Sequence, residues 1–243
     1  MSPARPRQSA CPPLPGRRHW LIGVALIVLF FAPGWCVMRA AADSRPSADP
    51  MTAVRAAIND AIAVFKDKSL PLVDRRDKLR ALAARYFDFQ DMARSALGYH
   101  WRDLTPAQRD QFVPLFTGFI QDAYLSKLRE YSVQKVQQAV ESVNIRFTQQ
   151  TFDGPDYAQV YSTVVLHDLK EPVQVNYLMH RAGEQWRIYD VSIDAISVIA
   201  NYRNQFNRVI NNQGYGQLVA DLHLKQQQLQ HDLDYPSPPA GSR

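Results

Sequence analysis

Cysteine is almost absent from this chain of 243 residues, which contains only two. Both of them, Cys11 and Cys36, precede residue 43, in a segment whose composition predicts removal after export. The remaining chain would then have no disulfide, no thiolate nucleophile and no cysteine-based metal site. Its stability has to come from a conventional hydrophobic core, and a chain of about 200 residues is long enough to form one.

Motifs that carry chemistry are missing as well. The sequence contains no glycine-rich phosphate loop, no HExxH zinc motif and no serine in a nucleophile elbow. The histidines beyond residue 43 are scattered without the spacing of metal ligands, at His100, His167, His180, His223 and His231. The sequence therefore predicts no cofactor and no metal, and it favours a binding protein over an enzyme.

One pair of carboxylates keeps an enzymatic alternative open. Asp190 and Asp194 are four residues apart, in a region where a strand is expected to turn into a helix. A buried member of this pair could act as the base of an isomerase or dehydratase in a cone-like α+β fold. The structural interpretation of the same two residues is helix capping, or an ion pair with Arg203.

The basic excess of the chain is confined to its beginning. Its formal net charge is +5, from 28 basic and 23 acidic residues. Five arginines precede residue 43 and no acid does, so the rest of the chain holds 23 bases against 23 acids. A protein that binds nucleic acid would keep its basic excess in the folded part, so this class is excluded.

The first 42 residues have the composition of an export signal. Arg17 and Arg18 precede an apolar run at 20–32, and three alanines at 40–42 offer a cleavage site before Asp43. The run is shorter than the roughly 20 residues that a membrane span needs. We therefore predict a signal peptide at 1–42, a linker at 43–50 and a periplasmic mature protein. Retention as an inner-membrane anchor is the alternative.

Helical periodicity dominates the chain from Val54 to Leu128. The apolar spacing predicts one helix before Pro71 and a second after it. Asp88 is a suitable cap for a third helix, which Gly98 would end. Thr105 and Pro106 open the longest helix, whose apolar positions extend to Leu128.

The following region has the composition of strands. Four segments rich in β-branched and aromatic residues, NIRFTQQ, YAQVYSTVVL, VQVNYLMH and QWRIYDVSI, are joined by short polar connectors. The fold class predicted is α+β, with N-terminal helices and a C-terminal helix packed on a four-stranded antiparallel sheet and enclosing an apolar cavity. We expect this domain to span 51–228, with a disordered proline-rich tail at 229–243.

The stretch WRIYDVSIDAISVIANYRNQF, at 186–206, changes from strand alternation to helical spacing near Asp194, which is a plausible N-cap. Its segments WRIYDVSID, AIS and NYRNQF, together with WRDLTPAQRDQF and Tyr124, resemble the signature of the MlaC-type family of periplasmic phospholipid-binding shuttles. The resemblance extends over roughly Val54 to Leu224. The family pattern has glycine where this chain has Ala195, which argues against a positive φ at this position.

The resemblance implies an exported carrier rather than an enzyme. Members of this family serve the transport system that maintains outer-membrane lipid asymmetry and toluene tolerance, between an inner-membrane ABC transporter complex and an outer-membrane lipoprotein complex. Relatives occur in hopanoid biosynthesis, so the expected cargo is a phospholipid or, as the alternative, a hopanoid-type lipid.

Apolar and aromatic side chains from the predicted strands and helices would converge if the helices wrap the sheet. Such a lining suits acyl chains, because each buried methylene contributes roughly 0.8 kcal/mol. An adaptor whose aromatic residues are merely core is the structural alternative. The predicted lipid-binding residues are Phe116, Phe119, Val160, Val164, Val175, Tyr177, Tyr189, Val191, Ile196, Ile199, Tyr202 and Phe206.

Overall fold

The computed structural model describes residues 49–129, 139, 141–165 and 171–234. The predicted signal peptide, the linker up to residue 48, His167 and residues 235–243 lie outside the described residues. The helices are α2 (Pro50–Lys66), α3 (Leu72–Tyr86), α4 (Phe89–Leu97), the 3₁₀ helix η1 (Gly98–Asp103), α5 (Pro106–Arg129), α7 (Val198–Gln213) and α8 (Tyr215–Asp234). The strands are β1 (Asn144–Asp153), β2 (Tyr157–Val165), β3 (Val173–Ala182), β4 (Gln185–Ile193) and β5 (Ile196–Ser197). None of the helices within the described ranges combines the length and hydrophobicity needed to cross a bilayer.

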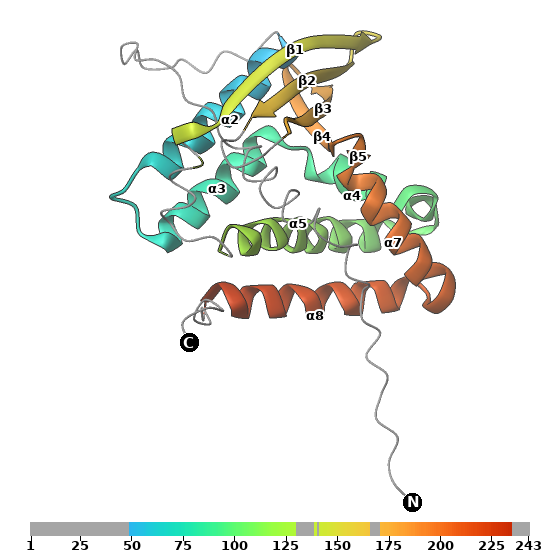
Figure 1. Ribbon diagram of the computed structural model, residues 1–243. Helices are drawn as coiled ribbons and strands as arrows, with labels where there is room; N and C mark the ends of the chain where they lie inside the picture. Colours follow the sequence, from blue (N-terminus) through green and yellow to red (C-terminus); the bar gives the residue numbers. More distant parts are fainter. Residues whose placement is uncertain (1–48, 130–138, 140, 166–170, 235–243) are drawn as a thin grey trace, which may run out of the picture.

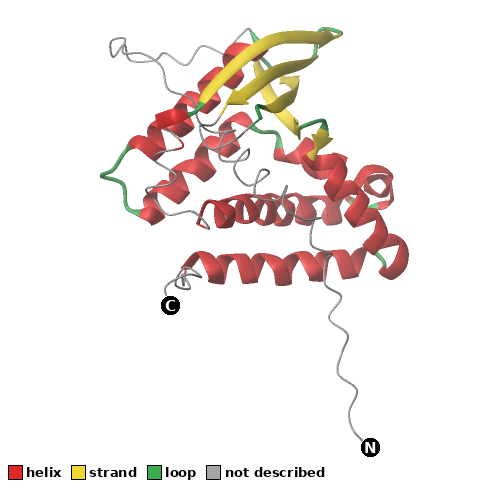
Figure 2. Ribbon diagram, viewed as in Figure 1, coloured by secondary structure: helices red, strands yellow, loops and turns green. Residues whose placement is uncertain are grey.

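The strands form one antiparallel sheet in the order β1-β2-β3-β4-β5, so each strand pairs with its neighbour in sequence (Figure 2). This confirms the predicted α+β fold and its meander, to which the two-residue β5 adds a fifth strand. Along β2 every second residue is buried, from Ala158 to Val164. One face of the sheet is therefore turned toward the core.

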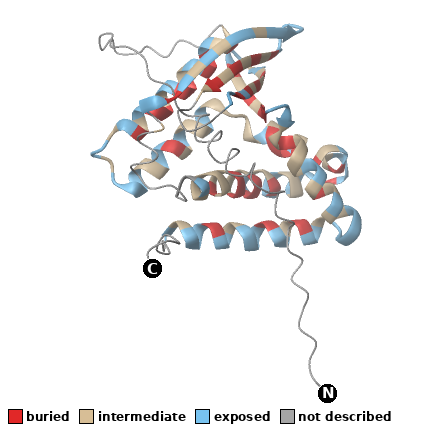
Figure 3. Ribbon diagram, in the orientation of Figure 1, coloured by how far each residue is buried: buried red, intermediate tan, exposed pale blue. Residues whose placement is uncertain are grey.

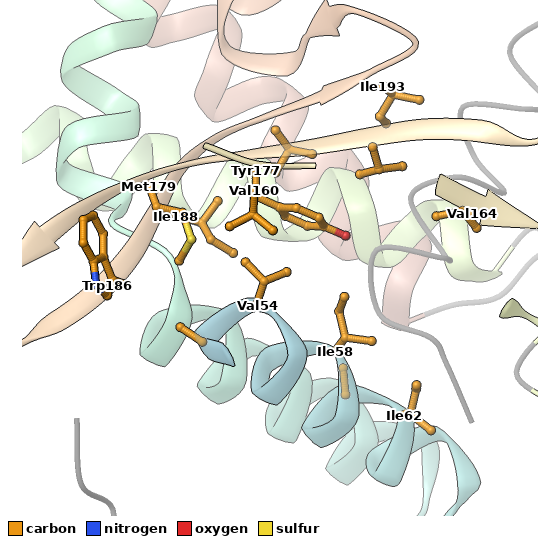
Figure 4. Packing of buried hydrophobic residues seen from close by; sticks show 14 of the residues in the cluster. Val54, Ile58, Ile62, Val160, Val164, Tyr177, Met179, Trp186, Ile188 and Ile193 are labelled. Carbon is orange, nitrogen blue, oxygen red and sulfur yellow. The ribbon is translucent and has the colours of Figure 1, made fainter. Parts of the chain in front are cut away.

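Helix α2 covers this buried face with an apolar stripe (Figures 1 and 4). Asp49 caps the helix by accepting a hydrogen bond from the Thr52 amide at 2.8 Å. We call the resulting core the sheet cluster. Its buried members are Ala53, Val54, Ile58, Ala61, Ile62, Phe65, Leu79, Val143, Ala158, Val160, Val164, Val173, Val175, Tyr177, Met179, Trp186, Ile188, Val191 and Ile193.

A second core lies between helices α4, α5, α7 and α8. In Figure 3 helices α5 and α8 run alongside each other in a layer separate from the sheet, and both have buried segments. The Phe206 ring meets the rings of Phe112 and Phe116 edge-on, with centroids 6.3 and 6.2 Å apart. We call this core the helix cluster. Its buried members are Met92, Ala93, Ala96, Leu97, Leu104, Phe112, Leu115, Phe116, Phe119, Ile120, Ile199, Phe206, Leu218, Leu222 and Leu229.

Helix α3 packs on α2 and is tied to α5 and α8 by charged contacts. Leu79 is its one buried residue. Arg80 donates to the buried carboxylate of Asp122 on α5 at 2.5 Å, and Gln230 on α8 donates to the same carboxylate at 3.2 Å. One turn earlier, Arg76 forms an ion pair of 2.9 Å with Asp234 on α8.

Both predicted ends of helix α4 are confirmed. The Asp88 side chain caps the helix by accepting from the Asp91 amide at 2.9 Å. Gly98 ends it with φ +58 and ψ −128, a conformation that only glycine adopts readily. A Cβ at this position would also lie 3.0 Å from Cδ of Arg203, so the Arg203 side chain would have to shift.

The connection between β4 and α7 differs from prediction in two respects. The N-cap of α7 is Ser197, not Asp194, and the Ser197 hydroxyl accepts from the Ala200 amide at 2.8 Å. Asp194 and Ala195 instead form a two-residue turn in which both have positive φ, 47 and 65. A tight hairpin between β4 and β5 requires this backbone shape. The expectation that Ala195 avoids positive φ is therefore wrong. Two hydrogen bonds hold the turn, because Asp194 donates to the Gln174 carbonyl at 2.9 Å and its carboxylate accepts from the Gln174 amide at 3.0 Å.

Helix α8 extends beyond the predicted end of the domain. It continues to Asp234, and Leu229 is buried in the helix cluster. The predicted boundary at residue 228 therefore falls inside a helix, and residues 229–234 are helical rather than disordered. The apolar spacing from Leu218 through Leu222 to Leu229 explains this, because it lets one stripe of the helix face α5.

Candidate functional site

The sheet cluster contains five of the predicted lipid-binding residues. Each of them is at most 6% exposed, and they lie on the adjacent strands β2, β3 and β4, in the core that α2 covers. Val160 pairs with Tyr177 across β2 and β3, and Tyr177 pairs with Val191 across β3 and β4. The other two members of this group are Val164 and Val175.

A second group of predicted residues lies in the helix cluster. Phe116, Phe119, Ile199 and Phe206 are buried there, and Tyr202 packs against them. The Tyr202 ring stands edge-on to Phe119, with centroids 5.6 Å apart. The described residues thus divide the predicted lining between two apolar groups, one on the sheet and one among the helices.

Two predicted residues belong to neither cluster. Tyr189 lies on the opposite face of the sheet, where its ring packs edge-on against Tyr157 and His180 at 6.2 and 5.8 Å. His180 is held by Asp88, with Nε2 and Oδ2 2.9 Å apart. Ile196 sits beside the tight turn and is 60% exposed.

The two clusters meet at residues outside the predicted lipid-binding set. Phe87 packs against both clusters. On α5, Leu125 contacts the sheet cluster while its neighbour Tyr124 contacts the helix cluster. The signal for this shared role was the apolar character of α5 around most of its circumference, which is typical of a helix with partners on more than one side.

A buried polar group anchors the start of α7 at this junction. Asp190 is 8% exposed, and one carboxylate oxygen accepts from the amides of Val191 and Ile199 at 2.7 and 3.1 Å. The other oxygen accepts from the Ser197 hydroxyl at 2.5 Å. Burial raises the pKa of the nearby Tyr124 phenol well above its usual value, and Tyr202 and Asp190 raise it further. The Tyr124 phenol therefore stays protonated.

These contacts give both carboxylates of the candidate catalytic pair a structural role. Asp190 accepts from an amide in the first turn of α7, and one oxygen of Asp194 holds the turn. Within the described part of the chain, no three histidine, cysteine, aspartate or glutamate side chains come together as metal ligands would.

Tyr177 brings a polar group into the sheet cluster. It is 1% exposed, and its hydroxyl has no hydrogen-bond partner among the described residues. Burial raises the pKa of this phenol well above its usual value, and the neighbouring Ser162 hydroxyl offsets only part of the rise. Leaving a buried hydroxyl unpaired costs about 1–3 kcal/mol.

The interior is apolar in both clusters, and its buried carboxylates make structural contacts. A family model described as MlaC protein matches residues 55–224, and the chain belongs to this family. The resemblance found in the sequence is therefore confirmed.

A solved structure supports the fold. It is described as a phospholipid-binding protein from Ralstonia solanacearum in complex with a phospholipid. The two chains are 24% identical and superpose with a TM-score of 0.61, over 75% of this chain and 99% of the other. At this level of identity the likeness shows a common architecture of helices and sheet.

Proposed function

We propose that this chain is a phospholipid carrier that holds the acyl tails of its cargo in the apolar interior between sheet and helices. Membership of the MlaC family is the observation that carries the proposal, and the phospholipid in the complex with the Ralstonia protein supports it. The physical argument is that tails need dry apolar surface. Each methylene that leaves water contributes roughly 0.8 kcal/mol, which offsets the separation of packed side chains.

The carrier passes its cargo between an inner-membrane ABC transporter complex and an outer-membrane lipoprotein complex. Transfer of this kind requires an interior that a partner can open. Helix α3 suits this role because Leu79 is its one buried residue and ion pairs tie it to α5 and α8. Water or a partner's charges can replace the exposed Arg76–Asp234 pair at small cost, so the Arg80–Asp122 pair, whose carboxylate is buried, is the contact that a partner has to break.

The direct test is mass spectrometry of lipid extracted from the purified, tag-free mature protein. We expect a diacyl phospholipid in stoichiometric amount. Protein that is lipid-free after expression in a phospholipid-rich host, and that takes up no fluorescent phospholipid from vesicles, would contradict the proposal. A hopanoid-type lipid as the dominant extract would change the cargo but keep the class.

Two neighbouring substitutions on β2 test where the tails lie. Val164→Asp places a charge in the sheet cluster, where it is desolvated without a partner, and should abolish lipid retention. Thr163→Asp, one residue earlier on the opposite face, should retain lipid. Far-UV circular dichroism of both variants establishes whether the fold survives. Equal lipid content in two folded variants would place the tails elsewhere.

We further propose that the protein acts in the periplasm after removal of residues 1–42. The composition of the first 42 residues supports this, as does a function between two membranes. Intact-mass measurement of the exported protein should give a chain that begins near Asp43 and lacks cysteine. A mass that includes residues 20–32 would indicate an inner-membrane anchor.

A further inference from the structure

The unpaired hydroxyl of Tyr177 lies in the core that the proposed function assigns to lipid tails. In Figure 4 its ring lies between the sheet and α2, among apolar side chains that include Val160 and Ile58. Buried hydroxyls in proteins are almost always hydrogen-bonded. Phenylalanine would fill this space without the cost of burying a hydroxyl that makes no hydrogen bond.

Among the described residues the Ser162 hydroxyl is near enough to lower the pKa of the Tyr177 phenol slightly, but it does not meet the geometry of a hydrogen bond with it. The Ser162 hydroxyl, which faces the same core, donates to the Val175 carbonyl at 2.8 Å. Elsewhere in the described chain, tyrosine hydroxyls do find acceptors: Tyr86 donates to Asp60 at 2.5 Å and Tyr99 to Asn211 at 3.1 Å. The Tyr177 phenol, which burial keeps protonated, therefore has no hydrogen-bond acceptor in good geometry among the described residues.

The chemistry of a phospholipid limits what that acceptor can be. Its phosphate and any charged headgroup stay near water, because a desolvated charge without a partner is far more costly than a desolvated carbonyl. The ester carbonyls are the polar atoms that accompany the tails into an apolar interior. They accept hydrogen bonds and cannot donate them, so they match a lone phenol.

We propose that the Tyr177 hydroxyl donates a hydrogen bond to an ester carbonyl of the bound lipid and thereby favours acyl-ester lipids over ether-linked lipids. This assignment rests on the proposed carrier function and adds a specificity determinant to it. Discrimination follows because an ether-linked lipid leaves the buried phenol unpaired, and sites that present a buried donor reject ligands lacking the acceptor.

One other donor in the sheet cluster has no partner among the described residues, the indole Nε1 of Trp186. Its ring contacts Phe152, which is 57% exposed, and lies under the Arg181 guanidinium at 5.2 Å. Figure 4 places Trp186 and Tyr177 apart in the cluster, with the indole nitrogen pointing away from Tyr177. The two donors can therefore be tested separately.

The test compares two phosphatidylglycerols with the same headgroup and chain length, one diester and one diether, binding to delipidated protein. We expect the wild type to prefer the diester about fivefold to tenfold, the ratio that one hydrogen bond supplies. Tyr177→Phe should lose this preference by weakening diester binding alone. The matched control is Tyr161→Phe, which removes the same atom from the half-buried opposite face of β2 and should keep the preference.

Four other results would contradict the assignment or the function on which it rests. Equal affinity of the wild type for both lipids would overturn it without any variant, as would an equal loss for both lipids in Tyr177→Phe. Loss of the ester preference in Trp186→Phe, with Tyr177→Phe unaffected, would assign the carbonyl to the indole instead. Failure of the wild type to bind either lipid would refute the carrier function itself, so the two hypotheses fail in distinguishable ways.

Discussion

Replacing Arg80 by methionine should destabilise this protein far more than the same replacement at Arg76, one turn away on α3. Arg80 neutralises Asp122, whose side chain is 1% exposed. Methionine keeps most of the apolar stem of arginine but removes the guanidinium. The Asp122 carboxylate would then be left with the neutral amide of Gln230, 3.2 Å away, as its remaining side-chain donor.

The size of the effect follows from the exposure of the two partners. Removing one member of a buried ion pair typically costs about 3–5 kcal/mol. The Arg80 side chain is 29% exposed, so water can partly replace it, and we expect about 2–3 kcal/mol. The partner of Arg76 is Asp234, which is 56% exposed, so Arg76→Met should cost about 0–1 kcal/mol.

Equilibrium urea unfolding of the lipid-free protein measures this difference. With a slope of about 2 kcal/mol per molar urea, the midpoint of Arg80→Met should fall by about 1–1.5 M, and that of Arg76→Met by less than about 0.5 M. Lipid must be absent, because bound ligand adds its own stabilisation. Equal losses in the two variants would refute the reasoning, since they would show that burial of Asp122 does not govern the strength of the pair.

Three further predictions concern stability. Ala195→Gly should raise the free energy of unfolding by about 0.5–1 kcal/mol in urea titrations, because the φ of 65 is costly for alanine; a loss would contradict the turn geometry. Trp186→Ala should cost about 3–5 kcal/mol and lower the melting temperature, since the residue is 3% exposed; a wild-type melting curve would mean that the strand is misassigned. Burial alone would raise the pKa of Asp49, but hydrogen bonds from Thr52 and Gln150 outweigh it and lower this pKa below 3.8. The stabilisation is therefore present above the unfolded-state pKa and lost as pH falls through the lowered value. Asp49→Ala should cost about 1 kcal/mol at pH 7, with the difference vanishing in acid; a cost independent of pH would exclude this role.

Local signals in the sequence were sufficient for the elements of the fold. Asp88 and Gly98 mark the ends of α4 because a cap and a positive-φ glycine act within one turn of the helix. Alternation in β2 predicted the inward position of Val160 and Val164, because alternation is likewise a local property of the chain. At Ala195 the local preference was overridden by pairing between β4 and β5, which imposes the turn on the residue available.

The candidate site was only partly predictable because it depends on register and on distant pairings. Tyr189 and Val191 are two residues apart, so simple alternation places them on one face. A bulge in β4 opposite Leu178 and Met179 inserts Tyr189 as an extra residue, and this reverses the alternation. The separation of the helix cluster from the sheet depends on α5 packing against α8, which no local pattern specifies.

The pairing of α5 with α8 also sets the order in which the newly made chain can fold. Asp122 and Gln230, which join the two helices, are 108 residues apart. At a synthesis rate of about 5–20 residues per second, α5 waits about 5–20 seconds for its covering helix. The side of α5 that α8 will cover is exposed to solvent throughout that interval. A chaperone that binds apolar helices would find its target there, and would be released when the last residues of the chain arrive.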